Sequence, residues 1–178
     1  EELYVGMTEE LVPHKTVNRP FPRLSYADSM SRYGSDKPDL RYGLELIDVA
    51  EIVLKSEFQV FKTALDDGGI VKGFAAPNMA DLPRRQIDLL TELAKSRGAQ
   101  GLVTIALDGD WTDSQHLQEG MVRSPVGRFI SIELIRELAT SLGAKGGDML
   151  LLEGGPSPVV YAALGELRQE VARQQELA

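Results

Sequence analysis

The sequence predicts an α+β fold in which a small mixed or antiparallel sheet is covered by helices in a two-layer domain. Short apolar runs rich in strand-forming residues alternate with amphipathic segments of about 16 residues between positions 44 and 155. Turn sequences that contain Gly, Pro or Asp separate these runs. No internal repeat or low-complexity tract interrupts the pattern.

The composition is that of an ordinary folded domain. The 178 residues are 43% hydrophobic and 26% charged, which supports one core, or one core with an appended segment. The net charge of −8 opposes long-range attraction to phosphate backbones, so any nucleic-acid contact should be local. The chain contains no Cys, which excludes disulfides and thiol chemistry and fits a reducing compartment. No apolar run approaches about 18 residues, so we expect no membrane contact and a cytoplasmic protein.

The N-terminal segment, residues 1–43, is expected to be irregular apart from one short helix. The prolines of Pro20–Pro22 require an extended chain. Ser25 and Asp28 fit a capping box for a helix that Gly34 closes. A stiff, charged loop follows, up to Arg41.

Residues 44–98 are expected to form two strands and two helices. The predicted strands cover 44–49 and 70–75, and a weak helix covers 50–60. A second helix should be capped by Asp81, with Pro83 in its first turn.

Residues 101–178 are expected to add two strands and two helices. The strands cover 101–107 and 149–152, separated by a polar loop at 110–120. Ser124 should cap the helix between these strands, and Ser157 begins the last helix, which carries an apolar seam.

The sequence contains few candidate catalytic residues. His14 and His116 are the only histidines, and neither has a partner at metal-ligand spacing. The glycine-rich stretch 143–147 lacks the spacing of a phosphate-binding loop, so we interpret it as a tight connection. The acidic pairs Asp66-Asp67 and Asp108/Asp110 are typical of turns and match no calcium loop. We therefore predict no catalytic, cofactor or metal site in this chain.

Four arginines are the candidate RNA contacts: Arg84, Arg85, Arg123 and Arg128. Positive charge in the first turn of a helix is mildly unfavourable with the helix dipole, which makes the first two a weak indication of a partner. A solvated surface is the simpler interpretation of all four. Trp111 could stack on a base, but packing beneath its loop is favoured.

Two consecutive motifs carry a family resemblance. They are FPRLSYADSM at residues 21–30 and RYGSDKPDLR at residues 32–41. Both closely resemble the run that leads into the inserted domain of bacterial-type aspartyl-tRNA synthetases. Further motifs resemble the same family: RQID at 85–88, GAQGL at 98–102, SPV at 124–126, GDM at 147–149 and ALGELR at 163–168.

The resemblance implies one module of a larger ligase. Residues 1–43 would be a flank from the catalytic domain, 44–157 the insertion domain, a type shared with an amidotransferase subunit, and 158–178 the return helix. The parent would be a class II aminoacyl-tRNA synthetase of protein biosynthesis that uses ATP and Mg²⁺ and is a homodimer. Its partners would be the catalytic domain and, through the parent, tRNA. The class II motifs are absent, so the chain itself should be non-catalytic.

The resemblance leaves the role of the module open. It could guide the acceptor arm of tRNA, act as a structural spacer, or bind RNA weakly. The charged residues of the loop, Asp36, Lys37, Asp39 and Arg41, are expected to contact the catalytic core. Exposed apolar residues on the flanks should lack their native partners and fray or pair with another copy: Phe21, Leu24, Leu164 and Leu167.

Overall fold

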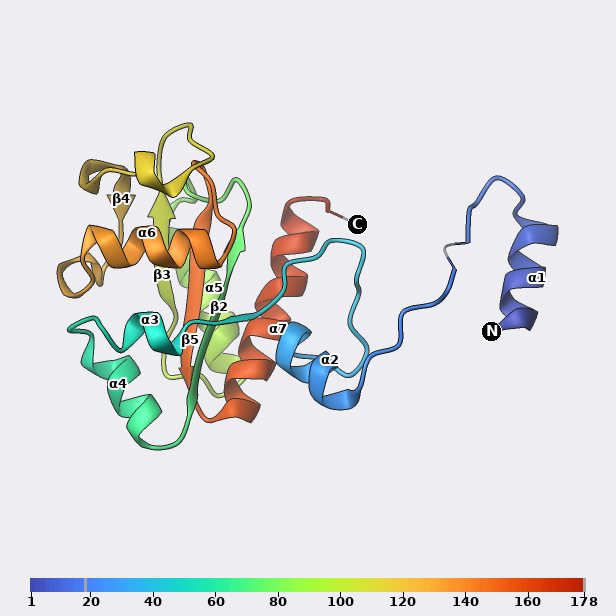
Figure 1. Cartoon of the computed structure of the whole chain (residues 1–178), viewed down its shortest axis with the longest axis horizontal. Coiled ribbons are helices and arrows are strands. Elements are labelled where there is room, and N and C mark those ends of the chain that lie inside the picture. The colour runs from blue at the N-terminus through green and yellow to red at the C-terminus, as the bar shows by residue number, and fades with distance from the viewer. Residues whose placement is uncertain (18, 178) are drawn as a thin grey trace.

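A five-stranded sheet forms the centre of the computed structural model, which describes residues 1–17 and 19–177 (Figure 1). The strand order is β1-β2-β5-β3-β4, and every neighbouring pair is antiparallel. The strands are β1 (Ile47–Asp48), β2 (Ile70–Ala76), β3 (Val103–Leu107), β4 (Val122–Arg123) and β5 (Met149–Gly155). This architecture confirms the predicted α+β fold with an antiparallel sheet covered by helices.

Seven α-helices accompany the sheet in the described part of the chain. They are α1 (Glu2–Leu11), α2 (Tyr26–Tyr33), α3 (Ala50–Val53), α4 (Gln59–Asp66), α5 (Arg84–Ser96), α6 (Ile132–Ser141) and α7 (Ser157–Gln174). Three single turns of 3₁₀ helix lie between β3 and α6: η1 (Ser114–His116), η2 (Glu119–Met121) and η3 (Gly127–Phe129).

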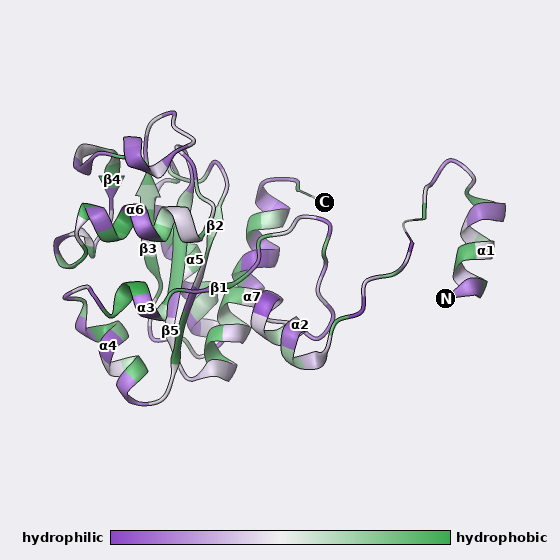
Figure 2. Ribbon diagram, in the orientation of Figure 1, coloured by the Kyte–Doolittle hydropathy of each residue, from purple (hydrophilic) through white to green (hydrophobic). Residues whose placement is uncertain are grey.

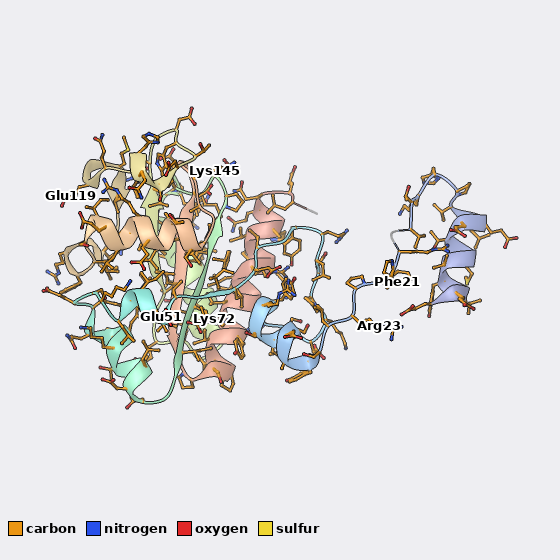
Figure 3. All side chains as sticks on the ribbon, in the orientation of Figure 1. Phe21, Arg23, Glu51, Lys72, Glu119 and Lys145 are labelled. Carbon is orange, nitrogen blue, oxygen red and sulfur yellow. The ribbon has the colours of Figure 1, made fainter. Side chains whose placement is uncertain are left out.

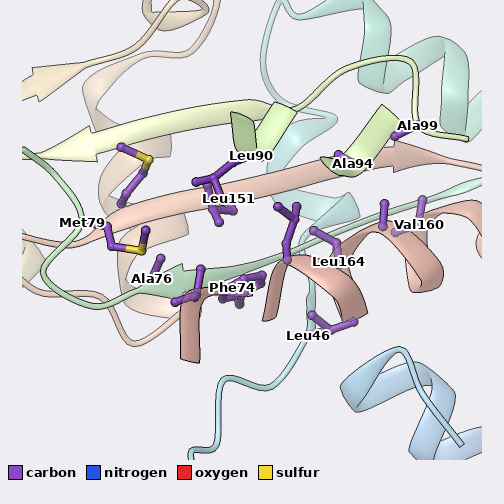
Figure 4. Packing of buried hydrophobic residues seen from close by; sticks show 14 of the residues in the cluster. Leu46, Phe74, Ala76, Met79, Leu90, Ala94, Ala99, Leu151, Val160 and Leu164 are labelled. Atoms are coloured by element: carbon purple, nitrogen blue, oxygen red, sulfur yellow. The ribbon is translucent and has the colours of Figure 1, made fainter. Parts of the chain in front are cut away.

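Helices pack on both faces of the sheet because its central strand is apolar on both sides. In β5, Leu151 belongs to a cluster with residues of α5 and α7, and the adjacent Leu150 belongs to a cluster with residues of α3, α4 and α6. Figure 2 shows the resulting hydrophobic colour along the central strands, and Figure 4 shows Leu151 beside Leu90 and near Leu164. Successive strand residues point to opposite faces, so a continuous apolar run buries both.

Helix α7 is part of this core. Leu164 and Leu167 are both 0% exposed, so the expectation that they would lie exposed on a flank is wrong. They pack against β2 and β5 as members of one cluster, which includes Phe74 and Leu151. Phe21 is 38% exposed, as expected of a flank residue, and Leu24 is half-buried.

Several predicted helix boundaries are wrong because a local side chain makes another contact. The helix expected at 50–60 is broken, since the Ser56 hydroxyl donates to the Val53 carbonyl and accepts from the Phe58 N–H. Helix α4 therefore begins only at Gln59. Pro83, and not Asp81, occupies the N-cap position of α5.

The helix expected from Ser124 also begins later. The Ser124 hydroxyl donates to the Thr104 carbonyl at 2.8 Å, while the two residues before it pair with β3 as strand β4. Helix α6 is capped instead by Ser131, whose hydroxyl accepts from the Leu134 N–H at 3.4 Å. Ser25 is confirmed as the N-cap of α2, since its hydroxyl accepts from the Asp28 N–H at 3.1 Å, and it also donates to the Asp28 carboxylate at 2.7 Å in place of the reciprocal backbone bond of a full capping box.

Helix α1 was not expected from the sequence and lies apart from the sheet (Figure 1). Its large apolar side chains are mostly exposed: Leu3, Tyr4, Met7 and Leu11. An extended segment at 21–25 connects this part of the chain to α2. No described helix is long and apolar enough to cross a membrane.

Candidate functional site

The candidate site is the junction between α7 and residues 34–46, which we call the junction loop. Arg168 lies at its centre with only 1% of its surface exposed. Its guanidinium donates to the backbone carbonyl oxygens of Asp39, Gly43 and Leu44 at 2.5–3.0 Å. One buried side chain on α7 thus binds the backbone in the middle of the junction loop at several points.

Two aromatic rings complete the environment of Arg168. The guanidinium carbon lies 4.8 Å from the ring centre of Tyr33 and 4.4 Å from that of Tyr42. A guanidinium N–H also donates to the Tyr42 hydroxyl at 3.2 Å. Both rings therefore stabilise the cation through their π electrons. Burial lowers the pKa of Arg168 from its ordinary value, while nearby hydroxyl and carboxyl groups oppose that shift.

The backbones of α2 and α7 meet beside this arginine. A Cβ on Gly34 would lie 2.3 Å from the Tyr161 carbonyl oxygen, and a Cβ on Gly165 would lie 2.7 Å from the Gly34 carbonyl oxygen. Gly34 also has a φ of 69°, the left-handed conformation that closes α2. Glycine is therefore required at both positions.

Lys72 on β2 ties the sheet to the same segment. It is 6% exposed, and its ammonium donates to the carbonyl oxygens of Ser31 and Leu46 at 2.9 and 3.2 Å. Figure 3 places Lys72 on the part of the sheet that lies toward α2 and α7. Burial lowers its pKa, and Asp48 opposes that shift. The sheet, α2 and the junction loop are therefore held together by hydrogen bonds to backbone.

An ion pair closes the junction loop on α2. Glu45 accepts from the Arg32 guanidinium at 2.6 and 2.9 Å and from the Tyr33 hydroxyl at 3.0 Å. The hydrogen bonds from Arg32 hold the pKa of the Glu45 carboxyl below its usual value. The pair is partly exposed, so its contribution to stability is modest.

Three of the four residues expected to contact a catalytic core are exposed, and Asp39 is half-buried. Asp39 accepts from the Arg41 guanidinium at 2.5–3.0 Å, and these hydrogen bonds lower the pKa of Asp39 to about 2. Asp36 and Lys37 are exposed. Contact of these side chains with a catalytic domain stays a prediction.

Three of the four candidate RNA contacts line two separate grooves. Arg84 and Arg123 line one groove of about 670 Å³ beside α5, and Arg128 lines another of about 580 Å³ beside η3. Arg123 donates to Asp108 at 2.7 Å and to Asp81 at 3.0 Å, so its charge is neutralised locally.

Weaker contacts involve the other arginines. Arg84 donates to Asp88 at 3.0 Å on an exposed surface. Arg128 lies 4.6 Å from the ring centre of Phe129, and Arg85 is exposed. The structure thus brings no basic patch together from all four side chains.

The remaining candidate residues have structural surroundings. Trp111 is 6% exposed and its indole N–H donates to the Asp108 carbonyl at 2.9 Å, which confirms the packing interpretation. The glycine-rich stretch 143–147 joins α6 to β5 as a tight connection. His14 and His116 are exposed. Among residues 1–17 and 19–177, no three His, Asp or Glu side chains gather as they would around a metal ion.

Comparison with known proteins shows the family. The model of the GAD domain matches residues 61–164, which is more than half of the chain. This chain belongs to the GAD domain family. The matched residues run from α4 through the sheet and into α7, so the GAD domain includes the helix that carries Arg168 only in part.

Curated relatives of this GAD domain chain are aspartate–tRNA ligases. It is 41% identical over 168 residues to the aspartate–tRNA(Asp/Asn) ligase of Rubrobacter xylanophilus, covering 94% of this chain and 26% of the relative. It is 39% identical over 161 residues to the aspartate–tRNA ligase of Clostridium acetobutylicum, covering 90% of this chain and 25% of the relative. The chain thus spans about a quarter of these relatives' length, and the resemblance to aspartyl-tRNA synthetases is confirmed.

Sequence reasoning missed Arg168 as a site residue. It lies one residue after Leu167 and four after Leu164, on the apolar seam of the last helix. A charged residue on a buried stripe is rarely left without partners, and that was the available signal. Its partners lie about 125 positions earlier in the chain, and no local pattern identifies them.

Proposed function

We propose that this GAD domain and its flanks belong to a ligase that attaches aspartate to tRNA with ATP, and that they take no part in the chemistry. The observation that carries this proposal is the similarity to aspartate–tRNA ligases over at least 90% of this chain, which covers only about a quarter of those relatives. The chain enters the domain through the junction loop and leaves it along α7, and the two are bonded to each other. Because these two connections are bonded to each other, the domain should move as one rigid unit relative to the neighbouring domain.

The proposed position is beside the acceptor arm of the tRNA. Support comes from the similarity to aspartate–tRNA ligases over nearly the whole chain. A domain inserted in the catalytic part of such an enzyme borders the space that the tRNA 3′ end must enter. ATP and Mg²⁺ would bind the catalytic domain, whose class II motifs lie outside these residues. The proposal includes a homodimeric, cytoplasmic ligase of protein biosynthesis.

A structural spacer is the second candidate function. The pairing of Arg123 with Asp108 and Asp81, and of Arg84 with Asp88, favours a spacer over a weak RNA-binding module. Binding to phosphate would require these arginines to leave their carboxylates, and the net charge of −8 opposes that exchange.

Two measurements on the ligase that carries this chain test the proposal. Aspartate-dependent exchange of pyrophosphate into ATP measures adenylate formation, and aminoacylation at varied tRNA concentration gives the KM for tRNA. We expect no exchange activity from the isolated 178-residue chain. Replacing residues 47–155 by a short Gly/Ser linker should keep adenylate formation and raise the KM for tRNA.

Each outcome has a definite meaning. Retained adenylate formation shows that the catalytic domain of the deletion variant is folded, so it is the internal control. Adenylate formation by the isolated chain would contradict a non-catalytic role. Unchanged aminoacylation by the deletion variant would contradict the acceptor-arm position and leave the spacer.

A further inference from the structure

We propose that Arg168 is a positioning residue that sets the orientation of the GAD domain against the rest of the ligase by locking the junction loop onto α7. This inference rests on the proposed function. The junction loop and α7 are the two connections between the sheet and the flanking segments. Their relative placement therefore decides where the sheet lies.

The partners of Arg168 fit a geometric role better than a stabilising one. Three of the four groups that accept from it are backbone carbonyl oxygens, so it is sensitive to the path of the loop and not to its side chains. No carboxylate bonds to it among the hydrogen bonds of the described residues. Burying a guanidinium without an ionic partner is costly, and an apolar side chain of similar volume would stabilise a core more.

The contacts around Arg168 fix how α2 and the junction loop pack against α7. Gly34 and Gly165 touch through their backbones, so α2 cannot slide along α7 without a clash. Lys72 holds the far end of the junction loop through the Leu46 carbonyl. Arg168 holds the middle of the loop, where the other bonds among the described residues run within the loop itself or to α2. Loss of Arg168 should therefore free the loop between two fixed ends.

Lysine cannot replace Arg168 in this role. The planar guanidinium directs its N–H groups at separate carbonyls while both ring contacts are kept. A lysine ammonium retains the charge but lacks the planar arrangement of N–H donors, so it can bond to only some of these carbonyl oxygens. Arg168→Lys thus separates geometry from charge. Arg168→Met keeps much of the side-chain volume but has neither charge nor hydrogen-bond donors. If both variants show the same effect, the effect does not come from the introduced lysine.

The experiment compares these variants with Arg173→Lys in the whole ligase. Arg173 lies on the same helix but is exposed and paired with Glu170, so it is the matched control. Amide hydrogen exchange of residues 39–44 reports on the lock. The KM for tRNA and the rate of adenylate formation report on function. Unfolding of the ligase, followed by circular dichroism, shows whether the variants are folded.

For Arg168→Lys we expect amide exchange of Arg41 and Gly43, whose N–H groups donate within the loop, to be about 10-fold or more faster, because the loop loses at least one of the carbonyl contacts that hold these bonds in place. The KM for tRNA should rise by about 5-fold or more, while adenylate formation stays within about 2-fold. Arg168→Met should show the same split, and Arg173→Lys should resemble the unaltered ligase.

Two outcomes overturn the inference. Unchanged amide exchange at 39–44 would show that Arg168 does not lock the loop. Faster exchange with an unchanged KM for tRNA would show that the lock is structural only. Failure of the proposed function is seen separately, in the variant that lacks residues 47–155 and in the isolated chain, so the two failures are distinguishable.

Discussion

Replacing Glu153 by Gln should remove a pH-dependent loss of stability. Glu153 lies on β5, is 4% exposed and faces Lys72 across the strand pair. The Lys72 ammonium donates to carbonyls of α2 and the junction loop. Burial therefore dominates and raises the pKa of the Glu153 carboxyl from 4.5 to about 8, and a hydrogen bond from the Gly154 backbone opposes part of that shift.

The direction of the effect follows from proton linkage. A carboxyl with a raised pKa in the folded state contributes its full stability below the unfolded pKa of 4.5 and loses it as the pH rises toward about 8. Each pKa unit corresponds to about 1.4 kcal/mol, so the loss across this window is at most about 5 kcal/mol. Rearrangement of the protein around the charged carboxylate and attraction to the nearby Lys72 ammonium reduce this loss. We therefore expect the free energy of unfolding to fall by about 2–4 kcal/mol between pH 5 and 8.

Urea unfolding of the chain at several pH values between 5 and 9 measures this loss. The free energy of unfolding of the unaltered chain should fall relative to that of Glu153→Gln as the pH rises, and the difference should level off above about pH 8. Glu51→Gln is the control, because Glu51 is exposed on α3. Parallel pH curves for the unaltered chain and Glu153→Gln would refute the reasoning.

Three further substitutions test the packing by urea unfolding. Leu164→Ala should cost about 2–5 kcal/mol because α7 is part of the core, whereas Leu89→Ala on the exposed face of α5 should cost far less; equal costs would contradict this role of α7. Gly165→Ala should cost about 1–3 kcal/mol, since its Cβ would lie 2.7 Å from a carbonyl oxygen at the end of α2, and Gly101→Ala, with no neighbour within 4 Å, should be nearly neutral. Ser131→Ala should cost about 1 kcal/mol by removing the cap of α6, and no loss would show that α6 begins elsewhere.

Most of the secondary structure could be predicted because it depends on local patterns. The apolar runs that became β2, β3 and β5 and the seam of α7 follow the side-chain periods of strands and helices. Boundaries were less predictable where a serine had two possible partners. Ser124 bonds to a distant strand, Ser131 caps the helix instead, and no local rule distinguishes them.

The candidate site was predictable only in part. The charged loop was identified by its composition and its family resemblance, and its position between the flank and the sheet follows from chain order. The four basic candidates could not be ranked, because the sequence does not show that Arg123 lies between two carboxylates. Its partner Asp81 is 42 positions away and was expected to cap a helix.

The sequence by itself determined the α+β class, the caps of α2 and the resemblance to one part of an aspartyl-tRNA synthetase, because these depend on residues close together in the chain. Only the tertiary structure decided that α7 belongs to the core and that Arg168 binds the junction loop about 125 positions earlier. The physical reason is that a buried charge requires partners, and folding alone brings those partners within hydrogen-bonding distance.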